Sequence, residues 1–389
     1  MHPPYSTLTP TRIYDYAAAL LEFHLQWQDH GPKCTVKVLL QVLFYAAGHL
    51  CSVFAACNQL RDVPSDQAVR DALAVLCPDP VPLEQRVNRL FAAQLPKGLR
   101  KRSQRVAIDL TLVPYHGQPH QQPTEIYRGQ AKSGTTHFHA YATAYIVRRG
   151  QRFTVALLRV EHGTPMVEVL KRLLHLARQA GIRPRLLLLD RGFYSVEVIR
   201  YLYRARYPFV MPVVRHGRSI DDPRGPSGTQ VFAQIKHSGW YSYTLTNADK
   251  QTATVRICVH CRNWQGRRER HGRHTLLYAC WGIGIRSTDW VYQTYRRRFG
   301  IETSYRQLNE ARIKTTTRDP ALRFLFVAIA LILRNAWVWV HHQLLATPCR
   351  GGRKLNLGLL PFKTLLLWLA YVAMQTFGVV DTVAMARAP

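Results

Sequence analysis

The period of the hydrophobic pattern divides the chain into a helical first part and a strand-rich middle part. Residues 1–104 place apolar side chains at helical spacing, most clearly over 36–50, and Ser65 is a suitable N-cap for a further helix. From residue 106 onward, apolar and polar positions alternate as they do in strands. This alternation predicts an antiparallel meander of three strands, at 106–113, 137–147 and 153–160.

A helical crossover is expected after the meander. Pro165 is typical of the first turn of a helix, and Gly181 is typical of its end. Four leucines then precede Asp190, and such a continuous apolar run favours a strand that is buried on both faces. Ser195 opens another helix, and residues 207–214 return as a strand. We therefore expect an α/β fold in which helices flank a mixed sheet.

The last part of the chain changes character twice. Residues 215–286 combine Gly, Pro, Ser and Arg with short alternating runs, which predicts a β-rich insertion. The apolar stretches 324–333 and 364–374 are shorter than the roughly 20 residues that span a bilayer, so we expect buried helices. The predicted organisation comprises a helical N-terminal DNA-binding domain (1–104), the two parts of a core (105–214 and 287–345), the insertion (215–286) and a C-terminal helical region (346–389).

The net charge of the chain indicates what kind of partner it binds. The 389 residues include 53 Lys and Arg against 23 Asp and Glu, a formal net charge of +30. Such an excess indicates a polyanionic partner, and the preference for arginine favours nucleic acid over an anionic membrane. The segment 57–73 has the length and turn of a helix-turn-helix motif, although ordinary helical hairpins share them. The basic segment 97–105 is either a solvated connector or a phosphate contact.

The cysteines and the N-terminus indicate a cytoplasmic protein without a zinc site. Eight cysteines are scattered among apolar neighbours, as expected of reduced core residues. Cys258 and Cys261 superficially resemble a metal-binding pair, but no second pair follows, and the strand pattern around them directs the two side chains to opposite faces. The N-terminal residues 1–5 lack the features of a signal peptide.

Two acids stand out because each belongs to an apolar strand of a very basic chain. Asp190 ends the leucine strand, where the ligands of open α/β sheets gather, and Asp109 lies inside the strand 106–113. Neighbouring carboxylates repel each other unless a cation lies between them, so the pair suggests a metal site. Glu161 is the main rival for a place among these acids, and a role in the loop that starts a helix is the alternative.

A third acid is predicted on a helix over 289–314. Tyr295, Arg298 and Glu302 recur at i, i+3 and i+7 and so share one helix face. The permanent charge of Arg298 would keep Glu302 ionised and available to a metal. A surface helix held by salt bridges is the alternative, but it would require more acids than this helix carries.

Together these residues resemble a known family. Asp109 in Ile-Asp-Leu-Thr, Asp190 in Leu-Asp-Arg-Gly-Phe-Tyr-Ser and the spacing Tyr295-x2-Arg298-x3-Glu302 are similar to the three signature blocks of insertion-sequence DDE transposases, which have an RNase H-like catalytic core. The resemblance covers about residues 105–335. A separation of 112 residues between Asp190 and Glu302 resembles the subgroup that carries a β-strand insertion before the glutamate helix.

The resemblance implies a metal-dependent enzyme acting on DNA. Asp109, Asp190 and Glu302 would hold two Mg²⁺ ions, for which Mn²⁺ can substitute, and the site would cut a transposon end and join it to target DNA. The implied partners are double-stranded DNA, in the form of terminal inverted repeats and target, and a second copy of the chain on paired ends. The location would be the cytoplasm, in association with the nucleoid and not a membrane.

Further residues are expected to contact DNA. By resemblance, Tyr295 and Arg298 contact the transposon end near the cleaved strand. The family signature continues with a basic residue where this chain has Asn309, and Arg306, Arg312 or Lys314 would have to supply that charge. The complete set of candidate DNA-binding residues is Tyr295, Arg298, Tyr305, Arg306, Lys314, Trp264, Arg267, Arg268 and Arg270.

Three other functions remain open from the sequence. A two-metal nuclease that does not join strands would need the same acids. A non-catalytic DNA-binding protein using the N-terminal helices would leave the three acids unexplained. The departure at Asn309 also fits an inactivated transposase.

Overall fold

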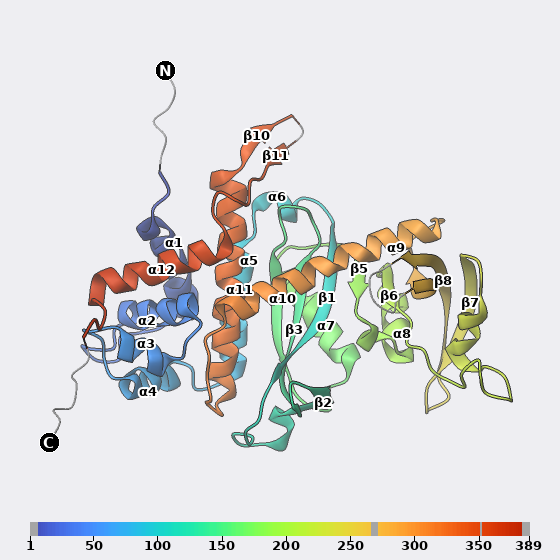
Figure 1. The fold of residues 1–389 in the computed structure, drawn as a ribbon, viewed down its shortest axis with the longest axis horizontal. Helices are drawn as coiled ribbons and strands as arrows, with labels where there is room; N and C mark the ends of the chain where they lie inside the picture. The colour runs from blue at the N-terminus through green and yellow to red at the C-terminus, as the bar shows by residue number, and fades with distance from the viewer. Residues whose placement is uncertain (1–6, 266–270, 351, 383–389) are drawn as a thin grey trace. The chain divides into compact units, whose positions relative to one another are not determined.

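The chain forms two compact units in this computed structural model. The structure describes residues 7–265, 271–350 and 352–382. It does not describe the side chains of residues 264, 265, 271–273 and 301–304. The first unit is drawn from residues 1–96, 113–139 and 303–389. The second is drawn from residues 97–112 and 140–302. Each unit therefore combines segments that are far apart in the sequence, as the colours of Figure 1 show.

Helices dominate the first unit. They are α1 (Pro10–Leu25), α2 (Val36–His49), α3 (Val53–Gln59), α4 (Asp66–Leu76), α5 (Pro80–Gln94), α11 (Pro320–Val340) and α12 (Phe362–Phe377). The predicted N-cap is confirmed, since the Ser65 hydroxyl accepts a hydrogen bond from Ala68 N at 3.3 Å and α4 begins at the next residue.

The C-terminal helix α12 packs against α2 near the other end of the chain. Gly48 permits the close approach, because a Cβ atom there would come within 2.7 Å of the Leu366 carbonyl oxygen. The Gln41 side chain donates to Thr376 Oγ1 at 2.8 Å across the same contact. The predicted C-terminal helical region thus contributes to one core with the N-terminal helices.

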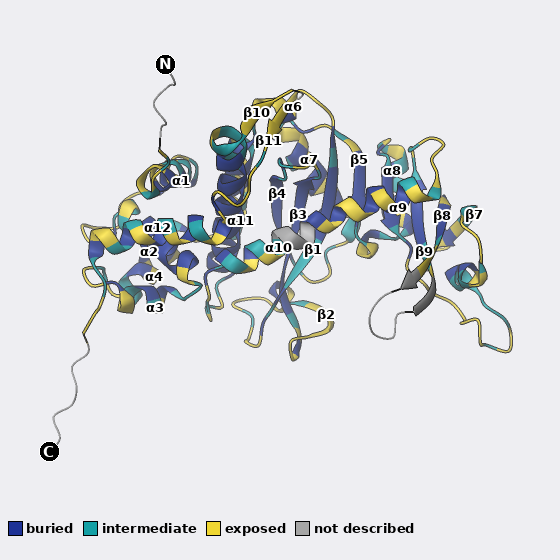
Figure 2. Cartoon of the chain, turned by 45° about the horizontal axis from the view of Figure 1, so that its top comes forward, coloured by how far each residue is buried: buried dark blue, intermediate teal, exposed yellow. Residues whose placement is uncertain are grey.

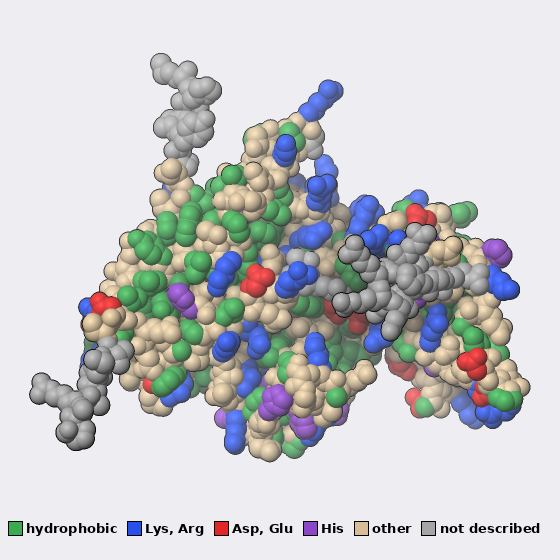
Figure 3. Space-filling model, viewed as in Figure 1, with side chains coloured by type: hydrophobic (Ala, Val, Ile, Leu, Met, Phe, Trp, Pro, Cys, Tyr) green, Lys and Arg blue, Asp and Glu red, His purple; other side chains and the backbone are tan. Residues whose placement is uncertain are grey.

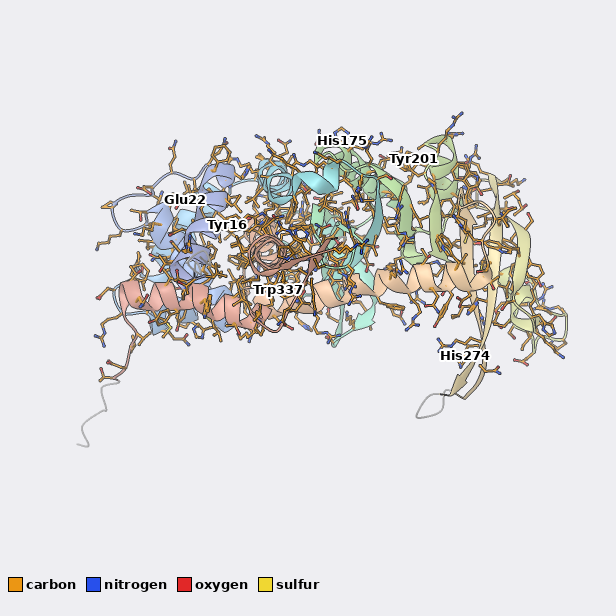
Figure 4. The ribbon with its side chains drawn as sticks, turned by 90° about the horizontal axis from the view of Figure 1, so that it is seen from above. Tyr16, Glu22, His175, Tyr201, His274 and Trp337 are labelled. Carbon is orange, nitrogen blue, oxygen red and sulfur yellow. The ribbon has the colours of Figure 1, made fainter. Side chains whose placement is uncertain are left out.

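Helix α11 forms the most apolar part of this unit and is drawn almost entirely as buried in Figure 2. The apolar run was predicted to be too short to cross a membrane, and this was wrong for the helix itself: Pro320–Leu345 is long and apolar enough by length and composition. Its most apolar window is nevertheless completely buried inside the protein. Trp337, labelled in Figure 4, donates its indole N–H to the Leu360 carbonyl at 2.7 Å.

Smaller elements complete the first unit. They are a 3-10 turn (Pro123–Glu125), strand β2 (Tyr127–Lys132), a π-helical turn (His341–Leu345) and the hairpin strands β10 (Thr347–Cys349) and β11 (Gly352–Lys354). Strand β2 pairs antiparallel with the first residues of β3, where Tyr127 lies opposite Phe138.

A mixed sheet forms the centre of the second unit. Its strands are β1 (Gln104–Pro114), β3 (Thr135–Ile146), β4 (Thr154–Val160), β5 (Pro184–Leu189), β6 (Phe209–Pro212), β7 (Gly239–Thr246), β8 (Thr252–Gln265) and β9 (His271–Trp281), and the first residues of β3 and the last of β1 belong to the first unit. They lie in the order β4, β3, β1, β5, β6, β9, β8, β7. The predicted α/β class with a mixed sheet and helical termini is confirmed.

The insertion continues this sheet. Strand β1 is parallel to β5, and β5 is parallel to β6, as a helical crossover requires. Strand β6 then pairs antiparallel with β9, where Phe209 lies opposite Trp281. Strands β7 and β8 extend the same antiparallel ladder. The predicted β-rich character of 215–286 is confirmed, and its strands are joined to the sheet by hydrogen bonds.

Helices α7 (Met166–Gln179) and α8 (Val196–Arg204) accompany the parallel strands, with short helical pieces at Lys97–Arg100 (α6), Arg191–Phe193 and Gly228–Gln234. The Lys171 ammonium of α7 lies 5.7 Å from the ring centre of Tyr201 on α8, which is labelled in Figure 4. Gly181 has φ +79°, the left-handed conformation that ends α7 where the sequence predicts.

The helix predicted over 289–314 has an interruption. It consists of α9 (Thr288–Arg296), a 3-10 turn (Arg297–Phe299) and α10 (Gly300–Ala311). Gly300, which lowers helix propensity, begins the second segment. The prediction of a helix over 289–314 was therefore wrong at 297–299, where Arg298 lies in the interruption, and at 312–314, because α10 ends at Ala311.

Candidate active site

Two adjacent parallel strands bring the predicted acids together. Ile108 of β1 lies opposite Leu189 of β5, so the next residues along the two strands are neighbours: Asp109 in the middle of β1 and Asp190 directly after the carboxyl end of β5. Asp109 is buried, with 8% of its surface exposed, and one of its carboxylate oxygens accepts from Leu110 N at 2.9 Å. Asp190 starts the 3-10 turn that follows β5.

A single guanidinium joins the two acids. Arg298 Nη2 lies 2.9 Å from Asp109 Oδ1 and 3.2 Å from Asp190 Oδ1. Arg298 and Asp109 are both buried, so their ion pair is shielded from water, whereas the Asp190 side chain is 39% exposed and its ion pair is open to solvent on one side. The arrangement satisfies the electrostatic need that the sequence indicated, because two neighbouring carboxylates are stabilised by a cation between them.

Tyr295 lies beside Arg298 and contacts both it and strand β5. Its hydroxyl donates to the Leu189 carbonyl at 3.2 Å, and its ring centre lies 5.7 Å from the Arg298 guanidinium. Burial raises the pKa of Tyr295 far above its ordinary value, so the phenol stays neutral. Tyr295 and Arg298 were predicted to contact DNA, and in this structure both are buried beside the acids.

Glu302 lies on α10, four residues beyond Arg298, and its side chain is outside the described residues. Within the part of the chain that is described, no three His, Cys, Asp or Glu side chains are grouped to hold a metal ion. Asp109 and Asp190 provide hard carboxylate oxygens, the donors that Mg²⁺ prefers. Both carboxylates face a position that already holds a positive charge, Arg298 Nη2, so the chemistry of these two donors suits a cation.

Next to Asp190, the second unit contains a large basic cavity of about 1050 Å³. Its wall includes four arginines with exposed side chains, Arg191, Arg215, Arg262 and Arg296. Aromatic side chains also line it, including Tyr278, Tyr292, Tyr295 and Phe299. Guanidinium groups and aromatic rings are the groups that grip phosphates and stack on bases.

Tyr292 organises one side of the cavity. The ring of His260 stacks on it with centroids 4.6 Å apart, and the guanidinium groups of Arg262 and Arg296 each lie 5.5 Å from its centre. The sequence pattern did not single out this cluster, because Arg262 and Arg296 come from different elements. The only local signals were the high arginine content of the insertion and the arginine run 296–298 that begins at the end of α9.

The other predicted DNA contacts fall in different places. Arg306 and Lys314 are exposed and Tyr305 is half-buried, and all three belong to the first unit. Asn309, which replaces the signature basic residue, is exposed on α10. The side chain of Trp264 and all of Arg267, Arg268 and Arg270 lie outside the described residues.

Two rival sites receive no support from the contacts. Glu161 forms an ion pair with Arg159, which accounts for its charge away from the two aspartates. Cys258 is buried in strand β8, and its thiol donates to the Thr288 carbonyl at 3.9 Å. Burial raises the pKa of the Cys258 thiol to about 12, which disfavours the thiolate that binds metals.

Figure 3 shows the charge of the chain on one face, where Lys and Arg side chains far outnumber Asp and Glu. This excess of positive charge, like the arginines of the cavity wall, is expected to attract a polyanion. Asp109 and Asp190 therefore place two acids together in a chain in which positive charge predominates.

Comparison with known proteins gives a family model and several solved structures that match. The family model described as "Transposase DDE domain" matches residues 100–336. No curated protein matches the chain. Among solved structures, the cryo-EM structure of a piggyBac transposase synaptic complex with hairpin DNA is similar with a TM-score of 0.56 and 10% sequence identity. This match covers 97% of the present chain and 82% of the other, and at such identity it shows a shared fold.

Proposed function

Since the chain belongs to the transposase DDE domain family, and is thus an enzyme that cleaves and transfers DNA, we propose that Asp109, Asp190 and Glu302 form its catalytic centre. The observation that carries the proposal is the pair of neighbouring carboxylates, Asp109 within β1 and Asp190 directly after β5, which share one cation. The fold, with this pair on adjacent parallel strands and Glu302 on a following helix, supports an RNase H-like core.

The three acids would hold two Mg²⁺ ions, or Mn²⁺ in their place. Bound there, the ions would activate the attacking water or 3′-hydroxyl and stabilise the leaving oxygen of the phosphodiester. The buried position of Asp109 on β1 and its ion pair with Arg298 hold one carboxylate, and the contact with Arg298 holds that of Asp190, which directly precedes the 3-10 turn. The protein's own contribution is thus to hold its oxygens in a constant geometry.

We assign the DNA strand near the reaction to the basic cavity. Arg191 directly follows Asp190 and lines the cavity, so a phosphate bound there would lie close to the acids. Arg262 and Arg296, braced against Tyr292, would neutralise backbone phosphates, while the rings offer stacking surfaces for unpaired bases. Trp264, Arg267, Arg268 and Arg270 of the insertion, and Tyr305, Arg306 and Lys314, are proposed as further contacts.

The remaining parts of the proposal concern partners. The piggyBac structure is a synaptic complex with hairpin DNA, which supports DNA binding by a chain of the same fold. We propose that this enzyme is encoded by an insertion sequence, binds its terminal inverted repeats as a homodimer on paired ends, and works in the cytoplasm at the nucleoid. The helix pair α3 and α4, with the turn between them, is the proposed helix-turn-helix contact to the repeats.

Cleavage and joining can be tested together. Full-length protein would be incubated with Mg²⁺, a supercoiled plasmid carrying the element's terminal repeats, and a second plasmid as target. A transposase yields cut ends and joined products, and D190N abolishes both. A nuclease without strand transfer would cut and leave no joined product, and a non-catalytic DNA-binding protein or an inactivated copy would shift the DNA and leave it uncut.

A further inference from the structure

We propose that Arg298 is an internal counter-ion of the catalytic acids, which holds Asp109 and Asp190 in position before metal binds and must leave them when metal arrives. The inference rests on the proposed catalytic centre and adds a step to it. Arg298 would then have two alternative partners. In the free enzyme it pairs with the two acids, and in the enzyme that has bound metal and DNA it pairs with a DNA phosphate.

The first step is the electrostatic need for such a group. Asp109 is buried, and Asp190 lies beside it at the end of the adjacent strand. Without a cation the two charges would repel, and the carboxylates would take up a proton or move apart. Arginine meets this need better than any other residue, because its guanidinium stays charged even when it is buried.

The second step is that this cation and a metal ion need the same space. One nitrogen, Arg298 Nη2, contacts an oxygen of each acid at 2.9 and 3.2 Å. A bridging Mg²⁺ would need those oxygens at about 2.1 Å with near-octahedral geometry, which leaves no room for the nitrogen between them. Two divalent ions would also repel a guanidinium at this distance.

The third step concerns how Arg298 could leave. It lies in the 3-10 turn Arg297–Phe299 between α9 and α10, and a 3-10 stretch inside a helix is a common site of local rearrangement. Tyr295 is anchored separately, through its hydroxyl bond to the Leu189 carbonyl. Its ring therefore keeps its place when the guanidinium moves away.

The fourth step is the destination. Arg296 and Phe299, on either side of Arg298 in the sequence, both line the basic cavity proposed to hold the DNA strand. A phosphate in that cavity would offer the released guanidinium a bidentate partner. Metal binding and DNA binding then favour each other, and by linkage each must strengthen the other by the same factor.

The test measures metal binding without catalysis. Mn²⁺ affinity of the full chain would be measured by isothermal titration calorimetry in the absence of DNA, for wild type, R298Q and R297Q. Arg297 occupies the same turn but is exposed, so R297Q is the matched control. We expect R298Q to bind Mn²⁺ at least about tenfold more tightly than wild type, within the usual range of coupling between sites, and R297Q to be unchanged.

A second readout is thermal stability. In EDTA, R298Q should unfold at a lower temperature than wild type, because its two acids have lost their cation. Mn²⁺ should raise the unfolding temperature of R298Q more than that of wild type. Equal or weaker Mn²⁺ binding by folded R298Q would overturn the proposal, since Arg298 would then only position the acids.

If R298Q does not fold, two other measurements still test whether Arg298 is the counter-ion of the acids. R298K keeps one positive charge but loses the planar fork, and it should bind Mn²⁺ with an affinity above that of wild type. At constant ionic strength, replacing EDTA with Ca²⁺ should strengthen the binding of a repeat-end duplex by wild type. The same replacement should strengthen binding by D190N less. The absence of both effects would contradict the inference.

The same titrations separate this inference from the proposed function. D109N and D190N should lose Mn²⁺ binding if the acids form the metal site. If they bind Mn²⁺ like wild type, the catalytic centre is wrongly assigned. If they lose it and R298Q gains nothing, the catalytic centre stands and only the counter-ion role of Arg298 is rejected.

Discussion

At the scale of single residues, burial determines the chemical character of Asp109 and of two cysteines. Asp109 is buried in a strand, yet it keeps a charged partner in Arg298, and a buried ion pair loses much more when one member is removed than an exposed pair does. Cys258 and Cys280 are also buried, and for both of them burial raises the pKa more than the nearby charge of Arg256 lowers it, so their neutral forms are favoured.

The aspartates lead to a prediction about activity. D109N and D190N keep the size of the side chain but remove the charge that binds metal. Each should lower DNA cleavage by more than about 100-fold, because even residues behind metal ligands cost about 10 to 100-fold when changed. Cleavage rates on a repeat-end duplex give the measurement. D249N, an exposed acid of the second unit, is the control and should cleave at the wild-type rate.

The cysteines lead to a prediction about reactivity. Burial raises the pKa of Cys258 to about 12 and that of Cys280 well above its ordinary value, so neither forms thiolate at pH 8. Iodoacetamide at pH 8 should label the exposed Cys349 first and reach the other two only after unfolding. Mass spectrometry of tryptic peptides measures the order. Fast labelling of Cys258 in the folded protein, blocked by added zinc, would revive the metal-binding interpretation of Cys258 and Cys261.

At the scale of elements, long-range pairings determine what each helix and strand contributes. Strand β5 was predicted from its leucines alone. It brings Asp190 next to Asp109 only because it pairs with the parallel strand β1. Helix α2 was predicted from its helical spacing, but its close fit against α12 depends on Gly48. The break between α9 and α10 places Arg298 in a 3-10 turn, which a period-based prediction of one continuous helix does not resolve.

The contact between α2 and α12 can be tested through Gly48. Replacing a helical glycine with alanine normally stabilises a helix by about 1 kcal/mol. At Gly48 the new Cβ would lie 2.7 Å from the Leu366 carbonyl oxygen and 2.8 Å from Ala370 Cβ, and the backbone has to shift. We expect G48A to destabilise the protein by about 1 to 3 kcal/mol, as overpacking does.

The matched control for that experiment is G98A. Gly98 also lies in a helix, and an added Cβ there meets no atom within 4 Å. Chemical denaturation followed by circular dichroism gives the free energy of unfolding for both variants. An increase in stability for G48A equal to that of G98A would show that the two helices do not approach as closely as described.

At the scale of the whole molecule, net charge and its distribution govern the encounter with DNA. The formal charge of +30 attracts any polyanion, so it predicts affinity without sequence preference. Asp109 and Asp190, by contrast, lie together in the second unit, and Arg191, which directly follows Asp190, lines the basic cavity. Under the proposed function, the arginines that attract DNA and the acids that cleave it are different groups, so binding and cleavage should respond differently to salt.

This separation predicts the salt dependence of DNA binding. Each phosphate neutralised by an arginine adds about 0.9 to the slope of log affinity against log salt concentration. R191Q removes one cavity arginine and should reduce that slope by about one, with weaker binding to all sequences. Fluorescence anisotropy of a labelled duplex at several salt concentrations measures it. R172Q changes an exposed arginine of α7 that does not line the cavity, and an equal effect there would contradict the assignment.

Much of the fold could be predicted because its signals are local. The strands around Asp109 and Asp190, the caps at Ser65 and Ser195 and the end of α7 follow from neighbouring residues in the sequence. The length of α11 was underestimated, because Arg323 and Arg334 interrupt the apolar run although both are buried. Arg334 donates to the Gln307 side chain at 3.1 Å, a compensation that no local pattern indicates.

The sequence by itself determined the period of each segment, the basic character of the chain and the presence of isolated acids in apolar strands, because these properties depend on near neighbours. Only the tertiary structure decided that one guanidinium joins Asp109 and Asp190, and that segments from both ends of the chain form one helical unit. Arg298 is more than 100 residues from either aspartate, and such contacts depend on strand register and burial. The periodicity that predicts an element carries no information about which distant partner it meets.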